Sequence, residues 1–318
     1  MKTAFENYLS NFNQATWETT VMNLLPEIHD VDRNAAQIWF KFFPLNLFRA
    51  FEVAENKDEL AKKLIMQGKF ELREQINASH SFLYAHRFWN EAKAAIIERA
   101  GDSKQSDADL SNEIRAIAKS VAAKINKDAS LTISIVAVGL MTLVQVGLDG
   151  LKKSGDAINI NKNHHNKSPE KVLAERAKDD SQGVFGFLKS DVDKNWTVTW
   201  DENENNAKFK LINEEEIASA AARDNSQDWK AMDERRPEGV IPVECRSAAC
   251  GTCWVGVLGG AEKLSDVTPR EAKSMRRFGY IISDEPKPLI RLACMAQASG
   301  AVSIIPRPVS MTVEAGHF

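Results

Sequence analysis

The chain has 318 residues, of which 43% are hydrophobic and 27% are charged, and its formal net charge at pH 7 is −3. This length and apolar content suffice for two domains, each with a core of its own. The balanced charge and the lack of a basic cluster argue against a nucleic-acid partner, and no repeat or low-complexity segment is visible. We recognise no signal peptide at the N-terminus and therefore expect a reducing, cytoplasmic location.

The first half of the chain carries helical patterns. Aromatic residues at helical spacing predict one helix over residues 1–25, and a cap-like Asn-Lys-Asp-Glu sequence predicts another over residues 56–68. Two further helices are expected over residues 79–99 and 106–127. We therefore expect an all-α domain over residues 1–151, resembling no family, that serves docking or assembly.

The histidines of this half do not predict a metal site. His80 and His86 lie in one expected helix but six residues apart, which would place them on different faces. A shared metal ion is therefore disfavoured, and the lack of a Glu-x-x-His pair gives no support to a di-iron bundle. His164 and His165 fall in a polar stretch and are expected to be exposed.

The stretch from Leu131 to Leu148 is apolar on nearly all sides, and its 18 residues reach the lower limit for spanning a bilayer. One interpretation is a membrane segment, although Gln145 and three hydroxyl residues weaken it. The other is the central helix of a soluble bundle, covered by the amphipathic helices before it. We favour the buried helix because no aromatic belt brackets the stretch.

Residues 152–193 are rich in Lys, Asn, Asp, Ser and Gly and are expected to form a linker. A second domain is expected over residues 194–318. It begins with two alternating segments, residues 196–200 and 207–211, which are separated by a polar turn. Together they predict a β-hairpin.

Further elements are expected along the same domain. Residues 214–223 have helical composition, and residues 254–258 form a short β-branched segment. A capping box at Thr268 to Glu271, with Pro269 at the first helical position, predicts a helix that ends near residue 279.

The four cysteines of the chain are Cys245, Cys250, Cys253 and Cys294. Their spacing, C-x4-C-x2-C followed by a distant fourth, is that of plant-type [2Fe–2S] ligands. Disulfides are the first alternative, but a chain of this length does not need them to fold. Structural zinc is the second, but it would call for another C-x2-C pair or for histidines. The spacing favours a [2Fe–2S] cluster held by all four thiolates.

Residues 244–253, Glu-Cys-Arg-Ser-Ala-Ala-Cys-Gly-Thr-Cys, resemble the ligand loop of [2Fe–2S] ferredoxins of the plant and adrenodoxin type. Arg291-Leu-Ala-Cys294 is similar to the fourth-ligand segment of that family, and residues 301–305 resemble its closing strand. The resemblance extends over about residues 196–308. It implies a β-grasp fold and one-electron transfer. One departure is Ala248, where the family usually has glycine; if that position needs a positive φ, alanine is costly there.

This resemblance implies an electron carrier or an electron-transfer subunit, not an enzyme by itself. No dinucleotide-binding G-x-G-x-x-G sequence accompanies it. In the adrenodoxin-like branch the helix before the fourth ligand is acidic and docks basic partners. Here that helix is basic, which predicts either an acidic redox partner or a merely solvated face; its cations are Arg270, Lys273, Arg276 and Arg277.

Three hypotheses remain, in order of preference. The first is a soluble ferredoxin whose helical domain serves oligomerisation or docking to a redox partner. In the second, the stretch from Leu131 to Leu148 attaches the protein to a membrane, as a ferredoxin subunit of a larger redox complex. In the third, the protein is a non-carrier assembly or protective protein with a sensing or structural cluster.

Overall fold

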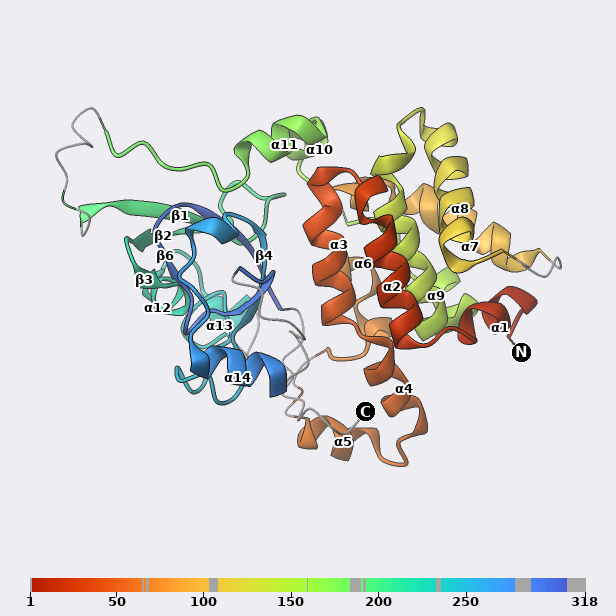
Figure 1. The fold of residues 1–318 in the computed structure, drawn as a ribbon, viewed down its shortest axis with the longest axis horizontal. Helices are drawn as coiled ribbons and strands as arrows, with labels where there is room; N and C mark the ends of the chain where they lie inside the picture. The colour runs from red at the N-terminus through yellow and green to blue at the C-terminus, as the bar shows by residue number, and fades with distance from the viewer. Residues whose placement is uncertain are drawn as a thin grey trace. The chain divides into compact units, whose positions relative to one another are not determined.

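The structure is a computed structural model, drawn in Figure 1, and it describes residues 2–64, 66, 69–102, 108–158, 160–183, 190, 193–232, 236–277 and 287–307. The chain divides into two compact units. The helical unit comprises Met1–Ala54 with Glu71–Ile160, and the sheet unit comprises Glu55–Phe70 with Asn161–Phe318. The expected helix ends at residues 68, 106 and 279 lie outside the described residues.

The helical unit is built from α-helices joined by short 3-10 turns. The α-helices are α1 (Ala4–Ser10), α2 (Gln14–Leu24), α3 (Asp30–Phe42), α4 (Leu45–Val53), α6 (Ile76–Ser79), α7 (Trp89–Gly101), α8 (Leu110–Ile125) and α9 (Ile133–Lys153). The 3-10 turns are η1 (Leu25–Glu27), η2 (Leu72–Glu74), η3 (Tyr84–Phe88) and η4 (Ala129–Leu131). The expectation of a mostly helical first half is confirmed.

Helix α9 is the centre of this unit, and α1, α3, α4, α7 and α8 all contact it (Figure 1). Its polar side chains find partners inside the unit: Thr142 Oγ1 donates to the Val138 carbonyl at 2.8 Å, and Gln145 Nε2 donates to the Phe43 carbonyl at 3.2 Å. A buried hydroxyl or amide without such a partner would cost a few kcal/mol. These contacts explain how a nearly all-apolar helix tolerates its polar residues in a protein core.

Among the described residues, α9 is the one helix long and apolar enough to cross a membrane, and 67% of its apolar window is buried. Its helical course is interrupted at Gly147, where φ is 71° and ψ is 167°. The Glu6 carboxylate accepts a hydrogen bond from the Leu148 N–H there, at 2.9 Å. The uninterrupted part, residues 133–146, is about 21 Å long at 1.5 Å per residue, which is shorter than a bilayer core of about 30 Å. The burial and the break both favour a core helix.

The expectation of one helix over residues 1–25 is wrong. The chain leaves α1 at Asn11, and Asn13 then caps α2 by accepting a hydrogen bond from the Thr16 N–H at 2.8 Å. An Asn at this position competes with the helix, because its side chain satisfies a backbone donor that a continuous helix would bond to a carbonyl.

The prediction of one helix over residues 79–99 is also wrong, and a residue far away in the sequence causes the break. The carboxylate of Asp32, on α3, is fully buried and accepts hydrogen bonds from the backbone N–H groups of Tyr84 and Ala85 at 2.6 and 2.9 Å. These two hydrogen bonds fix the start of η3, which separates α6 from α7. As a result His80 and His86 do not lie on different faces of one helix; their Nδ1 atoms are 2.8 Å apart in the core.

The sheet unit combines strands with short helices. The strands are β1 (Asn195–Thr199), β2 (Lys208–Ile212), β3 (Glu215–Glu216), β4 (Trp254–Gly259), β5 (Ile290–Leu292), β6 (Gln297–Ala298) and β7 (Val302–Pro306). The helices are α5 (Lys57–Lys63), α10 (Lys162–His165), α11 (Pro169–Glu175), α12 (Ile217–Arg223), α13 (Trp229–Met232), α14 (Pro269–Arg277) and the 3-10 turn η7 (Ala261–Lys263).

Five strands form a mixed sheet in the order β2-β1-β7-β4-β5, and β3 pairs with β6 beside it. The expected hairpin is confirmed, because β1 and β2 pair antiparallel. Strands β1 and β7 are parallel, with Val198 opposite Val302, and both of these side chains are fully buried. Helix α12 packs on β2. The sheet thus holds a core of its own between its strands and α12.

The stretch expected to be a linker contains α10 and α11 and belongs largely to the sheet unit. Arg176 follows α11 and pairs with Glu202, its Nε 2.8 Å from a carboxylate oxygen, with both side chains mostly buried. The expectation that His164 is exposed is wrong, because its side chain is only 8% exposed. Its Nε2 lies 2.8 Å from Asn205 Oδ1. Side-chain contacts with the sheet therefore order a segment whose composition is that of a loop.

Candidate functional site

Three of the four cysteines lie on the loop before β4, and this loop is tightly curled. Arg246, Ala248 and Gly251 all adopt left-handed backbone conformations, with φ of 47°, 58° and 68°. Left-handed residues set between ordinary ones turn successive backbone N–H groups to the same side, which makes a concave anion-binding surface. The conformation expected to be costly for Ala248 is therefore the one it adopts.

The inside of this loop carries hydrogen-bond donors directed at sulfur. The backbone N–H groups of Ala249 and Cys250 both donate to Cys245 Sγ at 3.3 Å. The buried hydroxyl of Thr252 lies 3.2 Å from Cys250 Sγ. Donors of this kind stabilise negative charge on sulfur, which a thiolate ligand carries.

Strand pairing delivers the fourth cysteine to the loop. Cys253 immediately precedes β4, Cys294 comes two residues after β5, and Trp254 pairs with Leu292 across the two strands. The Ala293 N–H also donates to the Cys253 carbonyl at 3.0 Å. Residues separated by about forty positions in the sequence are thus held next to each other by an antiparallel ladder.

The thiols interact as two pairs, because the pKa of Cys245 is affected by Cys250 and the pKa of Cys253 by Cys294. Burial alone would raise the pKa of Cys245, but the donated hydrogen bonds from Cys250 and Ser247 lower that pKa to about 6. The hydrogen bond with Cys253 likewise lowers the pKa of Cys294, whereas that bond and burial raise the pKa of Cys253 well above its usual value.

The chemistry of the four side chains is that of iron–sulfur ligands. All four thiols are free of disulfides. Within the described part of the chain, no three His, Cys, Asp or Glu side chains converge as ligands of a single ion. Two thiol pairs beside a loop of small residues suit a binuclear cluster, in which each iron takes two thiolates.

The two pairs differ in burial. Cys253 and Cys294 are each 2% exposed, whereas Cys245 and Cys250 are partly exposed. The exposed residues Arg246 and Ala249 lie between Cys245 and Cys250. The Cys245 and Cys250 end therefore lies nearest to the surface of the sheet unit.

A buried ion pair connects α14 to the strand before Cys294. Glu271 and Arg291 are both fully buried, and the carboxylate accepts from Arg291 Nε at 2.8 Å and from Nη2 at 2.9 Å. The same carboxylate also accepts from the Leu292 N–H at 3.0 Å. Thr268 caps α14 as predicted, by accepting from the Glu271 N–H at 3.2 Å. The Glu271 side chain, however, does not complete a capping box; it is committed to β5.

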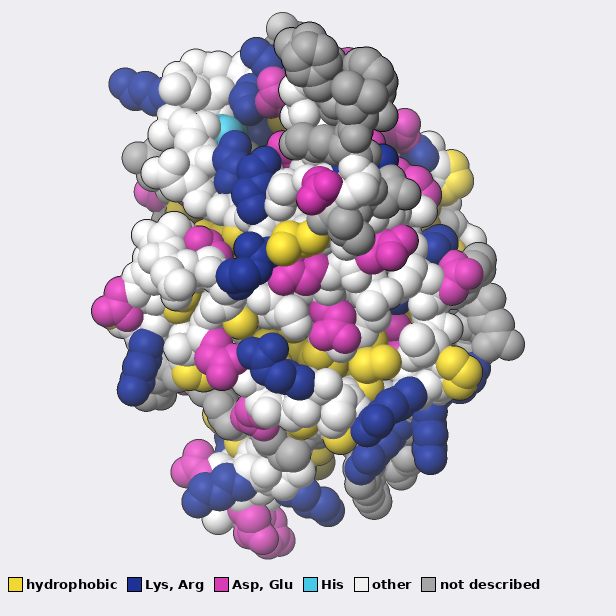
Figure 2. Space-filling model, turned by 90° about the vertical axis from the view of Figure 1, so that its left-hand side faces the viewer, with side chains coloured by type: hydrophobic (Ala, Val, Ile, Leu, Met, Phe, Trp, Pro, Cys, Tyr) yellow, Lys and Arg dark blue, Asp and Glu magenta, His cyan; other side chains and the backbone are white. Residues whose placement is uncertain are grey.

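The predicted cations of α14, Arg270, Lys273, Arg276 and Arg277, are all exposed. Over the face drawn in Figure 2, Lys and Arg side chains are interspersed with Asp and Glu. Charge of one sign therefore does not cover this face, and the cations of α14 form a local positive cluster.

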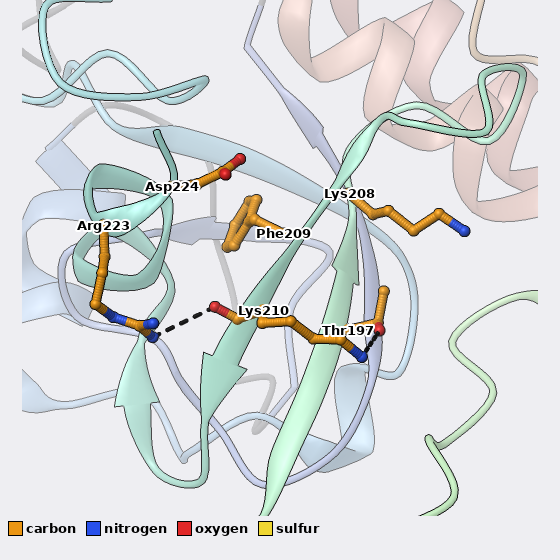
Figure 3. A pocket seen from close by; sticks show the side chains of 6 residues that line it. All are labelled: Thr197, Lys208, Phe209, Lys210, Arg223 and Asp224. Carbon is orange, nitrogen blue, oxygen red and sulfur yellow. Dashed lines mark hydrogen bonds between the residues drawn. The ribbon is translucent and has the colours of Figure 1, made fainter. Parts of the chain in front are cut away.

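A shallow pocket of about 270 Å³ opens at β1, β2 and α12, and two of its charged groups, Lys210 and Arg223, have partners (Figure 3). Lys210 Nζ bonds Thr197 Oγ1 and Asp180 Oδ1, both at 2.7 Å. Arg223 bonds the Lys210 carbonyl at 3.3 Å and also pairs with Glu215. None of the lining residues is a cysteine, so this pocket is separate from the thiol site.

Sequence reasoning missed the residues that support the thiols. Arg291 could have been noticed, because a lone charge in the apolar segment Ile290–Leu292 indicates a buried partner. The small residues of the loop indicate N–H donors near the sulfurs, but which N–H groups these are, and the role of Glu271, left no such signal. Both depend on backbone turns and on distant contacts.

Comparison with known proteins addresses this half of the chain. Neither the curated proteins nor the solved structures contain a match. Residues 214–299, which include all four cysteines, match the family described as "2Fe-2S iron-sulfur cluster binding domain". The match confirms the resemblance indicated by the cysteine spacing, and it identifies the cofactor of that family, a [2Fe–2S] cluster.

Proposed function

We propose that the protein is a one-electron carrier, or the carrier subunit of a larger assembly, which binds one [2Fe–2S] cluster through Cys245, Cys250, Cys253 and Cys294. The observation that supports this most is a loop that carries three of the cysteines and directs two N–H groups at Cys245 Sγ, beside a strand ladder that brings the Cys294 segment to Cys253. When bound, such a cluster accepts and releases a single electron; the protein holds, shields and orients it.

The two ends of the site have different tasks in this proposal. The buried thiols Cys253 and Cys294 exclude water from one side, while the partly exposed Cys245 and Cys250 provide the edge at which electrons enter and leave. The donors on Cys245 stabilise the extra negative charge of the reduced state.

We further propose that the sheet unit has the β-grasp arrangement. Its support is the mixed sheet with parallel β1 and β7 inside, the β1 and β2 hairpin at one edge, and α12 packed on β2. The ligand loop then follows α13 and leads into β4.

The proposed redox partner presents an acidic surface to the exposed cations of α14. This helix is tied to the strand that precedes Cys294, so a partner docked there would lie close to the thiol site. Charge complementarity of this kind mainly governs the rate and orientation of encounter. The helical unit, which has a core of its own, is proposed to serve docking or assembly in a cytoplasmic protein.

The cluster is tested on protein purified without oxygen. We expect two iron and two sulfide per chain, visible charge-transfer absorption, and a reductive titration that ends at one electron. Cys294→Ser should lose or shift this absorption while the far-UV circular dichroism of the helices stays. Ser219→Ala, on α12 and outside the loop, is the control. Wild-type protein without iron, or an unchanged spectrum in Cys294→Ser, would contradict the ligand assignment.

Docking is tested by charge reversal. Arg270→Glu with Lys273→Glu should slow electron transfer to the co-purifying partner and reduce its salt dependence, because steering is screened by ions. Lys208→Glu, an exposed lysine on β2, is the matched control. Equal effects of both changes would argue for a merely solvated helix face. Native mass with and without mild detergent tests the assembly role.

A further inference from the structure

One contact joins α14 directly to the cysteine loop. Ser274 Oγ donates to the Ala248 carbonyl at 2.6 Å, across 26 positions of the sequence. Ser274 is partly buried, and Ala248 is 2% exposed. The hydroxyl is therefore held at the back of the loop.

The accepting carbonyl belongs to the same peptide group as the Ala249 N–H, which donates to Cys245 Sγ at 3.3 Å. A peptide group is planar and trans, so its C=O and N–H point in opposite directions. Ser274 thus engages one end of a rigid plane whose other end is aimed at a sulfur. A hydrogen bond accepted at the carbonyl also polarises the group and strengthens its N–H as a donor.

The loop has particular need of such a restraint. Ala248 is left-handed, a conformation that costs a residue with a Cβ about 1 kcal/mol or more. Rotating this residue back to an ordinary φ would turn the Ala248–Ala249 peptide away from Cys245. The Ser274 hydrogen bond opposes that rotation.

We propose that Ser274 is a positioning residue that aims and polarises the Ala248–Ala249 peptide at Cys245 and so raises the reduction potential of the site. This inference rests on the proposed function, since it concerns the same cluster. Reduction adds one negative charge, and a firmly held donor on a ligand sulfur stabilises that charge. Ser274 touches no ligand itself and acts through the peptide.

The test uses an isosteric pair in the full-length, cluster-loaded protein. Threonine and valine have the same shape, so Ser274→Thr and Ser274→Val differ from each other in the hydroxyl group. We expect Ser274→Thr to keep the wild-type potential. In Ser274→Val the equilibrium constant for reduction should fall about threefold to fivefold, which is about 30 to 40 mV at 59 mV per tenfold change. Ser274→Ala, which needs no extra space, should shift in the same direction.

A second measurement separates positioning from general loosening. In pulsed electron paramagnetic resonance of the reduced protein, coupling to the exchangeable Ala249 proton should weaken in Ser274→Val and persist in Ser274→Thr. Equal potentials and equal couplings in the two variants would overturn the inference and leave the cluster assignment intact. Wild-type protein that holds no cluster would overturn both.

Discussion

The most demanding prediction concerns Glu271→Gln. Glu271 and Arg291 are each 0% exposed, and the pair joins α14 to β5. Arg291 lies three positions before Cys294 in the sequence. The change is nearly isosteric. It removes the negative charge and leaves the Arg291 guanidinium charged and buried.

The magnitude follows from the burial and from the four hydrogen bonds that meet there. Arg291 donates twice to the carboxylate and once to the Ser265 carbonyl, at 2.9 Å, and Leu292 donates to the carboxylate as well. Removing one partner of a buried ion pair costs about 3–5 kcal/mol. If a stability loss of about 3 kcal/mol appears wholly as a lower barrier to unfolding, the sheet unit should unfold roughly a hundredfold faster.

The assay is the rate at which visible cluster absorption disappears in a fixed concentration of urea, with circular dichroism at 222 nm reporting the helices in parallel. Glu271→Gln should bleach about a hundred times faster than the wild type. Arg270→Gln, an exposed change on the same helix, should stay within about 0.5 kcal/mol of it.

A variant in which both partners of the ion pair are replaced tests whether the unpaired charge causes the loss of stability. Glu271→Leu with Arg291→Met leaves no unpaired charge and should recover most of the loss, because hydrophobic replacement of a buried pair is often neutral. Bleaching of Glu271→Gln at the wild-type rate, or a double variant less stable than Glu271→Gln, would refute the reasoning.

Two further predictions concern other parts of the chain. Burial lowers the pKa of His86 to about 4 from an unfolded value of 6.5, so the unfolded chain binds more protons between these values. The contribution of His86 to the stability of the helical unit should therefore be full above pH 6.5 and about 2 kcal/mol smaller at pH 5. The buried His80, whose pKa burial also lowers, adds to the loss in the same direction. Urea titration followed at 222 nm checks this, and the same pH slope in His86→Asn would exclude His86 as its source. Ala248→Gly should slow cluster loss in urea by relieving the left-handed alanine, a gain of about 0.5–1 kcal/mol after the greater freedom of glycine in the unfolded chain; faster loss would show that the methyl group matters more than the backbone.

Much of the architecture was predictable because it depends on local patterns. Alternating residues predicted β1 and β2, and the family resemblance predicted β7, each to within a residue or two. The apolar run at residues 131–148 predicted α9 as a core helix. The cysteine spacing alone pointed to the cofactor, since three thiolates on one short loop and a distant fourth suit few other centres. These inferences needed no knowledge of what lies far along the chain.

Two of the failures share one physical cause: a distant side chain outweighed a local preference. Asp32 takes two N–H groups from residues 84 and 85, and this contact ends a helix that the sequence favours. Arg291 likewise draws Glu271 away from the capping role that its position predicts. A buried charge or a buried N–H costs more than a cap or a helical turn is worth, so the tertiary contact prevails.

By itself, the sequence determined which residues are available to hold a cluster and where most strands and the apolar helix lie, because spacing and periodicity are properties of neighbouring residues. The tertiary structure alone decided which thiols pair, which N–H groups face them, and that Glu271 and Ser274 tie α14 to the site. The contacts of Glu271, Ser274 and Cys294 join residues twenty or more positions apart. All of these contacts depend on backbone turns and burial, which exist only once the chain has folded.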